Sequence, residues 1–302
     1  MKLGVGILVA AMALTPLTDG FSKALATDQS PYFIVFSRYF VAGIIALGIS
    51  VIFRKPIEIP VHDRVGQVFR TGLMMSAMTA LIFALSIVPL AKAVGGFLIA
   101  PVVASLISVM LYKEKMDIFR FTGAGLSFAG AYVILRPEGS LELGTLLALL
   151  GGVLLGAYLA ATRRACACGD AFSTLVVQCI VGSLMLAPLA FWNGIPDISL
   201  QNLIFIVALG AVSAICHFLT VAAYNRAESS VLAPFFYFNI VFAIPVGYFW
   251  FNELPTQATL IGLAGITLGG VIAMLSANAQ LNSFKGILAN PWKFVKSFSL
   301  KI

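Results

Sequence analysis

Long apolar runs separated by short polar breaks dominate the sequence. Most of these runs approach the roughly 20 apolar residues that an α-helix needs to cross a bilayer. The breaks contain Pro, Gly and charged residues, as in the segment 252–255, Asn-Glu-Leu-Pro. The runs do not alternate between apolar and polar positions, so they do not predict strands. The pattern predicts ten transmembrane helices, over residues 3–26, 32–53, 69–88, 92–111, 118–135, 141–162, 172–192, 200–223, 231–251 and 258–276.

The composition supports an all-α membrane protein. Of the 302 residues, 60% are hydrophobic and only 10% are charged, whereas a soluble domain has about 25% charged residues. These values exclude a soluble enzyme, a disordered protein and a coiled coil. Ten helices use about 200 residues, which leaves no room for a separate soluble domain.

The placement of Lys and Arg predicts the orientation. The net charge is +7. With the N-terminus in the cytoplasm, 15 of the 19 basic residues lie in cytoplasmic loops and ends, Arg64 and Arg70 among them. Only Lys23, Lys92 and Arg136 lie outside, and Arg38 falls within a span. This bias predicts an integral protein of a bacterial cytoplasmic membrane with both termini in the cytoplasm.

The two ends of the chain need separate consideration. The start also resembles a secretory signal that ends at residues 24–26, Ala-Leu-Ala, but Asp19 and Lys23 are unfavourable so close to a cleavage site. We therefore predict a first helix there. The segment 277–302 contains four lysines and Trp292, which is typical of a basic cytoplasmic tail on anionic lipid. A disordered tail is the alternative. The expected macromolecular partner is thus membrane lipid and not nucleic acid.

The sequence contains a repeat. Glu114 is followed by Gly123 and Gly130, and Glu253 is followed at the same spacings by Gly262 and Gly269, an offset of 139 residues. Lys23 likewise matches Arg163, and Arg38 matches Gln178, at an offset of 140. We predict two five-helix repeats, over residues 1–136 and 141–276. Because five is odd, the second repeat must be inverted in the membrane, as in many secondary transporters.

The order of these features resembles the drug/metabolite transporter superfamily, in its ten-helix members with two EamA-type domains. The resemblance covers residues 1–276 and rests on Asp19, Lys23, Arg38, the segment 89–93, Pro101, Glu114, His217, Tyr224, the segment 231–237 and Glu253. It implies a ten-helix fold and transport of small organic solutes. The two halves differ in the position of one proline. Pro101 lies 13 residues before Glu114, but Ile240 lies 13 residues before Glu253, so we expect the two central helices to bend differently.

Three charged residues within the first two spans are candidate substrate-binding residues. Asp19 and Lys23 are four positions apart and share one helix face, and Arg38 offers a forked donor for a carboxylate. Charges within hydrocarbon are costly and usually functional. Together they predict binding of a zwitterionic or anionic metabolite. A structural ion network among the three is the alternative.

The second half offers further candidates. His217 suits a proton relay or a substrate contact, and an interhelical hydrogen bond is the alternative. Gln178 is the repeat mate of Arg38. Tyr224, Tyr237 and Asn239 predict an aromatic, weakly polar cavity wall, unless they face lipid. We expect Glu114 and Glu253 to act as favourable charges at the starts of the glycine-rich helices that follow them.

These features favour a secondary transporter that moves an amino-acid-like or S-adenosylmethionine-like metabolite by alternating access. A multidrug or riboflavin-like vitamin transporter of the same fold is the alternative, and a channel stays open. An intramembrane enzyme is least favoured because the chain has neither H-E-x-x-H nor G-x-S-x-G. We expect no catalytic residues, no cofactor and no metal site, since Cys166 and Cys168 lack further ligands at zinc spacing. A homodimer is left open.

Overall fold

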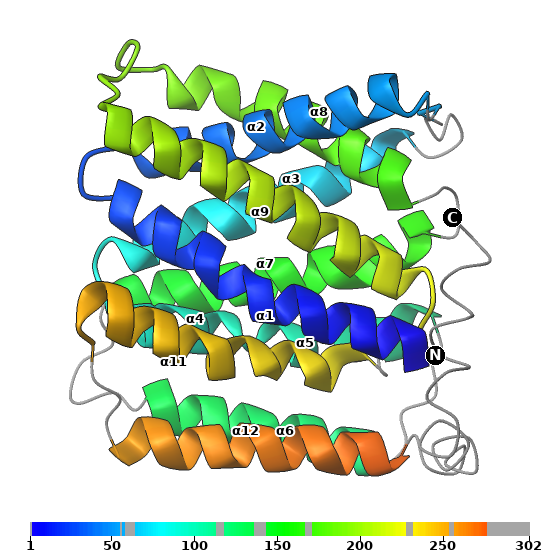
Figure 1. The fold of residues 1–302 in the computed structure, drawn as a ribbon. Coiled ribbons are helices and arrows are strands. Elements are labelled where there is room, and N and C mark those ends of the chain that lie inside the picture. Colours follow the sequence, from blue (N-terminus) through cyan, green and yellow to red (C-terminus); the bar gives the residue numbers. More distant parts are fainter. Residues whose placement is uncertain are drawn as a thin grey trace.

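The computed structural model contains helices joined by short turns and loops, and no strand, in the part of the chain that it describes, which is residues 2–54, 56–57, 64–112, 118–135, 143–166, 171–227, 232–253 and 257–276. The helices form one bundle (Figure 1). Their order is α1 (Lys2–Leu25), α2 (Pro31–Ile52), α3 (Arg64–Leu85), α4 (Leu90–Phe97), α5 (Ala100–Tyr112), α6 (Ile118–Leu135), α7 (Leu143–Cys166), α8 (Ala171–Ala190), α9 (Leu200–Tyr224), the 3-10 helix η2 (Ala233–Tyr237), α11 (Phe238–Phe251) and α12 (Gln257–Ser276).

Two serines begin helices where the sequence breaks predicted new spans. The Ser30 hydroxyl accepts a hydrogen bond from the Phe33 amide, and Pro31 occupies the first turn of α2, where its missing N–H costs nothing. Ser199 accepts from the Asn202 amide in the same way at the start of α9. Each serine satisfies an amide that would otherwise be free at a helix N-terminus. These caps fix where the spans begin.

The fourth predicted span, 92–111, is interrupted. It consists of α4 and α5, with Leu98 and Ile99 in a turn between them. Pro101 explains the position of the break, because it has no N–H to donate to the Phe97 carbonyl, the last of α4. The ninth predicted span, 231–251, begins instead as a 3-10 segment around Pro234 and continues as α11. The two central segments therefore differ in shape, as the different proline positions predicted.

The bundle has an apolar exterior. Six of the described helices have the length and composition to cross a membrane, and two shorter apolar stretches accompany them, Leu90–Ala104 and Phe235–Phe251. Large apolar side chains point outward, such as Phe249 and Leu184, which are 78% and 70% exposed. Water would make such a surface unfavourable, whereas lipid tails suit it. The protein is thus an integral membrane protein, and the number of ten spans stays a prediction.

The two halves of the chain pack through reciprocal helix pairs. α1 lies on α9 and α3 lies on α7; α1 also contacts α11, and α4 and α5 contact α7. α2 lies on α8, and α6 lies on α12. If α4–α5 and η2–α11 each count as one segment, each half has five segments. The first segment of each half, α1 or α7, then packs on the third and fourth segments of the other half. The centre of the bundle therefore lies between the halves.

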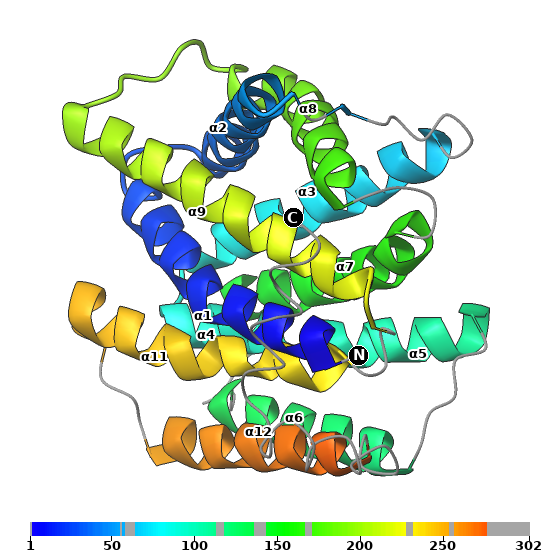
Figure 2. The ribbon, with the colours of Figure 1, turned by 45° about the vertical axis from the view of Figure 1, so that its right-hand side comes forward.

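Gly123, Gly130 and Gly269 of the sequence repeat lie in a close contact between α6 and α12. A Cβ atom on Gly265 would lie 3.2 Å from the Gly130 Cα, and one on Gly269 would lie 2.5 Å from the Gly123 carbonyl oxygen. Only glycine permits so close an approach of two backbones. Figures 1 and 2 show the resulting pair, α6 and α12, side by side along one edge of the bundle. The repeated glycines thus have a packing role.

The ends of the described chain lie on the same side. The first turn of α1 and the last turn of α12 are at the same end of the bundle (Figures 1 and 2). The predicted basic tail, 277–302, and Glu114 lie outside the described residues. The repeat boundaries 1–136 and 141–276 stay a prediction at this point.

Candidate functional site

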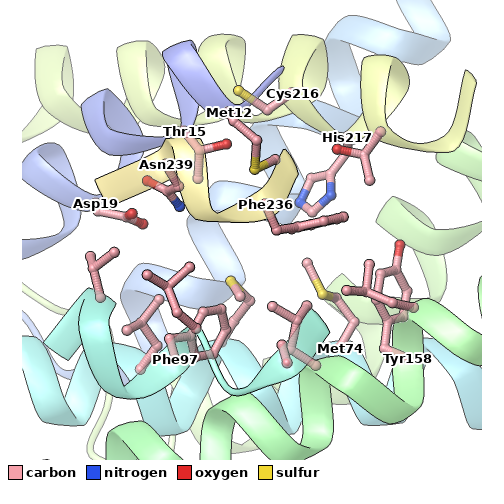
Figure 3. A pocket seen from close by; sticks show the side chains of 18 of the residues that line it. Met12, Thr15, Asp19, Met74, Phe97, Tyr158, Cys216, His217, Phe236 and Asn239 are labelled. Atoms are coloured by element: carbon pink, nitrogen blue, oxygen red, sulfur yellow. The ribbon is translucent and has the colours of Figure 1, made fainter. Parts of the chain in front are cut away.

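A cavity lies at the centre of the bundle and is lined by helices of both halves. Figure 3 shows its two walls: α1, α9 and the η2–α11 segment form one, and α3, α4 and α7 form the other. Its lining residues are Met12, Thr15, Asp19, Arg38, Met74, Met78, Leu81, Val94, Phe97, Leu98, Ala100, Pro101, Leu155, Tyr158, Leu159, Cys216, His217, Thr220, Phe236 and Asn239. The break between α4 and α5 contributes directly, since Leu98, Ala100 and Pro101 are in this set.

Four of the predicted site residues meet at this cavity. Asp19 and Arg38 come from the first half, and His217 and Asn239 come from the second. All four are buried, with at most 8% of their surface exposed. The structure thus brings polar groups from α1, α2, α9 and α11 to one place, which the sequence predicted as one candidate set.

Three polar atoms of these residues have no hydrogen-bond partner in the protein. They are Arg38 Nε, His217 Nε2 and Asn239 Oδ1. Arg38 also donates from Nη1 only to the thioether of Met78, at 3.6 Å, and it forms no ion pair with a described residue. Buried polar atoms are normally paired, and each exception needs an explanation. Here the shared cavity supplies one, because a bound solute would provide the partners.

Residues next to Asp19 change the backbone hydrogen bonding of α1. Pro16 has no N–H to donate to the Met12 carbonyl. The Thr15 and Thr18 hydroxyls donate instead to the carbonyls of Ala11 and Thr15. Such side-chain bonds bend helices slightly. Asp19 therefore follows a turn of α1 in which one backbone hydrogen bond is missing, and it lies at the cavity (Figure 3).

The remaining walls are apolar, with sulfur and aromatic groups. Met12, Met74 and Met78 supply flexible thioethers, and Phe97 and Phe236 supply ring faces. Thioethers adapt to ligands of different shape, and aromatic faces attract cations and flat rings. The cavity can thus hold a solute with a charged end and an apolar or aromatic end.

Lys23 lies outside the cavity lining and forms an ion pair. Its Nζ is 2.5 Å from Glu253 Oε1, and it also donates to the Val88 carbonyl at 3.4 Å. The other Glu253 oxygen accepts from the Leu90 amide at 3.1 Å. We expected Glu253 to serve the start of its own following helix, but it caps α4 of the other half. The carboxylate is favourable there because it faces the positive end of a helix.

Arg70 is the important residue that the sequence analysis placed wrongly. The predicted helix 69–88 begins one residue before Arg70, which was therefore counted with the cytoplasmic end of that span; α3 begins at Arg64 instead, and Arg70 is completely buried. The apolar pattern begins at Val65, and a helix that starts there places Arg70 well inside the span. Arg70 Nη1 donates to the hydroxyl oxygens of Tyr158 and Thr162, at 3.3 and 3.4 Å.

Gln178 belongs to this Arg70 network and not to the cavity lining. Its Oε1 accepts a hydrogen bond from the Tyr158 hydroxyl at 2.9 Å. Tyr158 itself lines the cavity, so Gln178 contacts a lining residue without lining the cavity itself. Tyr224 and Tyr237 are likewise fully buried and lie outside the lining. The Tyr224 ring packs 6.3 Å from that of Phe236, which does line the cavity.

The described residues provide no group of three His, Cys, Asp or Glu side chains close enough to hold a metal ion. Cys166 and Cys168 are not covered by that statement, because the side chain of Cys166 and all of Cys168 lie outside the described part. Cys179 and Cys216 are free, buried thiols. Cys216 lines the cavity and Cys179 does not.

Comparison with known proteins identifies the family. The sequence profile of the EamA-like transporter family matches twice, at residues 2–136 and 142–275. The chain belongs to this family. The S-adenosylmethionine uptake transporter of Rickettsia bellii is 24% identical over 264 residues, which covers 86% of this chain and 89% of that protein. The riboflavin transporter of Vibrio cholerae is 23% identical over 186 residues, which covers 60% of this chain and 61% of that protein.

The EamA-like fold also has a solved counterpart. A crystal structure aligns with a TM-score of 0.77 over 93% of this chain and 99% of the other, at 18% sequence identity. At this identity the likeness concerns the fold alone. The match to the family profile and the named relatives confirm the resemblance to the drug/metabolite transporter superfamily and the assignment to a family of transporters.

Proposed function

We propose that this EamA-like protein is a secondary transporter whose central cavity binds a small organic solute with an amino-acid-like part. The carrying observation is the meeting of Asp19, Arg38, His217 and Asn239 at one cavity between the halves, three of them with an unpartnered polar atom. The Arg38 guanidinium suits a carboxylate. Asp19 suits an ammonium or sulfonium group.

The size and chemistry of the other walls extend this proposal. Phe97 and Phe236 suit an aromatic base, and the three methionines suit an apolar chain. S-adenosylmethionine combines an amino acid, a sulfonium and an adenine, and the Rickettsia relatives bear its name. A riboflavin-like vitamin is the second candidate, since the aromatic walls suit its flat ring and the Vibrio cholerae relative bears that name.

The arrangement of the halves supports alternating access as the mechanism. The reciprocal helix pairs are those expected of two inverted repeats related by a twofold axis in the membrane plane. We place both termini in the cytoplasm and the protein in a bacterial cytoplasmic membrane. Rocking of the halves about the cavity would expose it to each side in turn.

Transport by purified protein in vesicles tests the proposal. Labelled S-adenosylmethionine, a neutral amino acid and riboflavin would each be offered to the wild type and to Asp19→Asn and Arg38→Met. We expect saturable, counterflow-capable flux of one of them and at least a tenfold loss in both variants. Asp197→Asn and Arg64→Met are matched controls, because both residues are exposed.

Two outcomes would oppose the proposal. Wild-type flux that does not saturate would indicate a channel. Flux that both cavity variants retain in full would remove the proposed site, provided that the variants show the same elution profile as the controls.

A further inference from the structure

Arg70 is a buried cation with no anionic partner among the residues that the structure describes. Its side chain is fully buried, and its hydrogen bonds go to uncharged groups: the Tyr158 and Thr162 hydroxyls and the Gln67 carboxamide oxygen, the last at 3.1 Å. It forms no ion pair with any described residue. A buried charge without a counter-charge is strongly unfavourable. Something must therefore balance it in the folded protein.

The groups around Arg70 have more free donors than free acceptors, the free acceptor being the hydroxyl oxygen of Tyr39 beside Gln178. Arg70 Nε, Gln67 Nε2 and Gln178 Nε2 are buried and have no hydrogen-bond partner. All three are N–H donors, and the carboxamide oxygens of both glutamines are already used. The two glutamine side chains are at least 97% buried. A water molecule would satisfy a donor, but it would leave the positive charge in place.

The charges of the buried core lead to the same conclusion. Among the described residues, the charged side chains that are buried are Asp19, Arg38 and Arg70. One carboxylate against two guanidinium groups leaves an excess of one positive charge. Even if Asp19 balances Arg38 across the cavity, Arg70 stays uncompensated.

We propose that Arg70, Gln67 and Gln178 form an anion-binding subsite, distinct from the cavity and separated from it by Tyr158. The occupant is a small anion that accepts N–H bonds: a halide, inorganic phosphate or a small carboxylate. The Tyr158 ring lies 5.4 Å from the Arg70 guanidinium carbon and also lines the cavity. An anion bound at Arg70 is thus one side chain away from the solute.

Thermal unfolding of the detergent-solubilised full chain tests this subsite. Sodium chloride, sodium phosphate and sodium acetate would each replace sodium HEPES at constant ionic strength, since the HEPES sulfonate is too bulky for a buried site. We expect at least one of the three to raise the unfolding midpoint saturably, by about 3 °C or more. No solute is present, so the result does not depend on the proposed function.

A variant that supplies the anion covalently makes the test specific. Gln67→Glu would place a carboxylate at the atom that already accepts from Arg70. We expect this variant to have a raised midpoint in HEPES and no further rise with any of the three anions. Gln201→Glu, at an exposed position of α9, is the matched control and should respond like the wild type.

The outcomes distinguish the possible kinds of bound anion, and some of them would overturn the subsite. A response to chloride or phosphate assigns a free inorganic ion, and a response to acetate alone assigns a small carboxylate. No response in the wild type would overturn the proposal. So would an undiminished response in Gln67→Glu, or a midpoint of that variant in HEPES below that of the wild type.

Discussion

Lys23 and Glu253 are 230 positions apart in the sequence, yet their side chains form an ion pair that joins the end of α1 to the end of α11. The same carboxylate caps α4 through the Leu90 amide. One acidic residue from the second half thus holds two helices of the first. The pair lies at the end of the bundle opposite the first turn of α1 (Figure 1).

Reversing this ion pair separates its two roles. Glu253→Gln should lower the unfolding midpoint by a few degrees, because it removes the ion pair and weakens the helix cap. The double reversal, Lys23→Glu with Glu253→Lys, restores opposite charges but places a cation at the start of α4. We expect it to recover only part of the loss. Full recovery in a thermal unfolding series would mean that the cap contributes little.

The same ion pair is expected to limit the access of water-soluble reagents to the cavity from the Lys23 side. If it holds that end closed, Glu253→Gln should speed the reaction of Cys216 with a membrane-impermeant thiol reagent added on the Lys23 side. The other three cysteines would first be replaced by serine. An unchanged labelling rate, with the reagent still reacting from the opposite side, would show that other contacts close this end.

Asn239→Leu should have opposite effects on stability and on solute binding. The Asn239 oxygen is buried without a partner, so its removal should stabilise the empty protein. Solute affinity should fall about tenfold, since a hydrogen bond of the complex is lost. Unfolding midpoints with and without the transported solute measure both effects. A variant that binds as tightly as the wild type would remove Asn239 from the site.

Pro101→Ala should join α4 to α5. Alanine restores an N–H for the Phe97 carbonyl and favours a continuous helix. We expect slower transport with solute binding changed less than transport, because the break lines the cavity and would bend during rocking. Pro188→Ala, at an exposed position within α8, is the control. Equal transport by both variants would argue that the break is static.

Gly269→Leu should prevent α6 and α12 from packing. A Cβ atom there meets the Gly123 carbonyl and the Ser127 backbone, neither of which is able to move far. We expect little monodisperse protein on size-exclusion chromatography. Gly125→Ala on α6 is the control, because nothing lies within 4 Å of its added Cβ. Normal yields of Gly269→Leu would mean that the two helices separate without cost.

The helices were largely predictable because the apolar runs carry the signal directly. The repeated glycines were also visible, although the sequence does not say that they pack on each other. The partners of Lys23 and Arg70 were not predictable, because ion pairs and hydrogen-bond networks between distant segments depend on tertiary packing. Asp19, Arg38, His217 and Asn239 stand out in the sequence because polar residues are rare within such runs, and the structure places all four at one cavity. The Arg70 network was missed because the predicted helix begins only one residue before Arg70, so this residue was counted with the cytoplasmic end of the span.

The contact between α6 and α12 affects how the chain is made. Each is the last helix of its half, and each needs the other to cover its glycine face. While the ribosome is still producing the second half, α6 has to wait in the bilayer with that face against lipid. Neither half would then be a complete folding unit, and two fragments divided between them would assemble only when synthesised together.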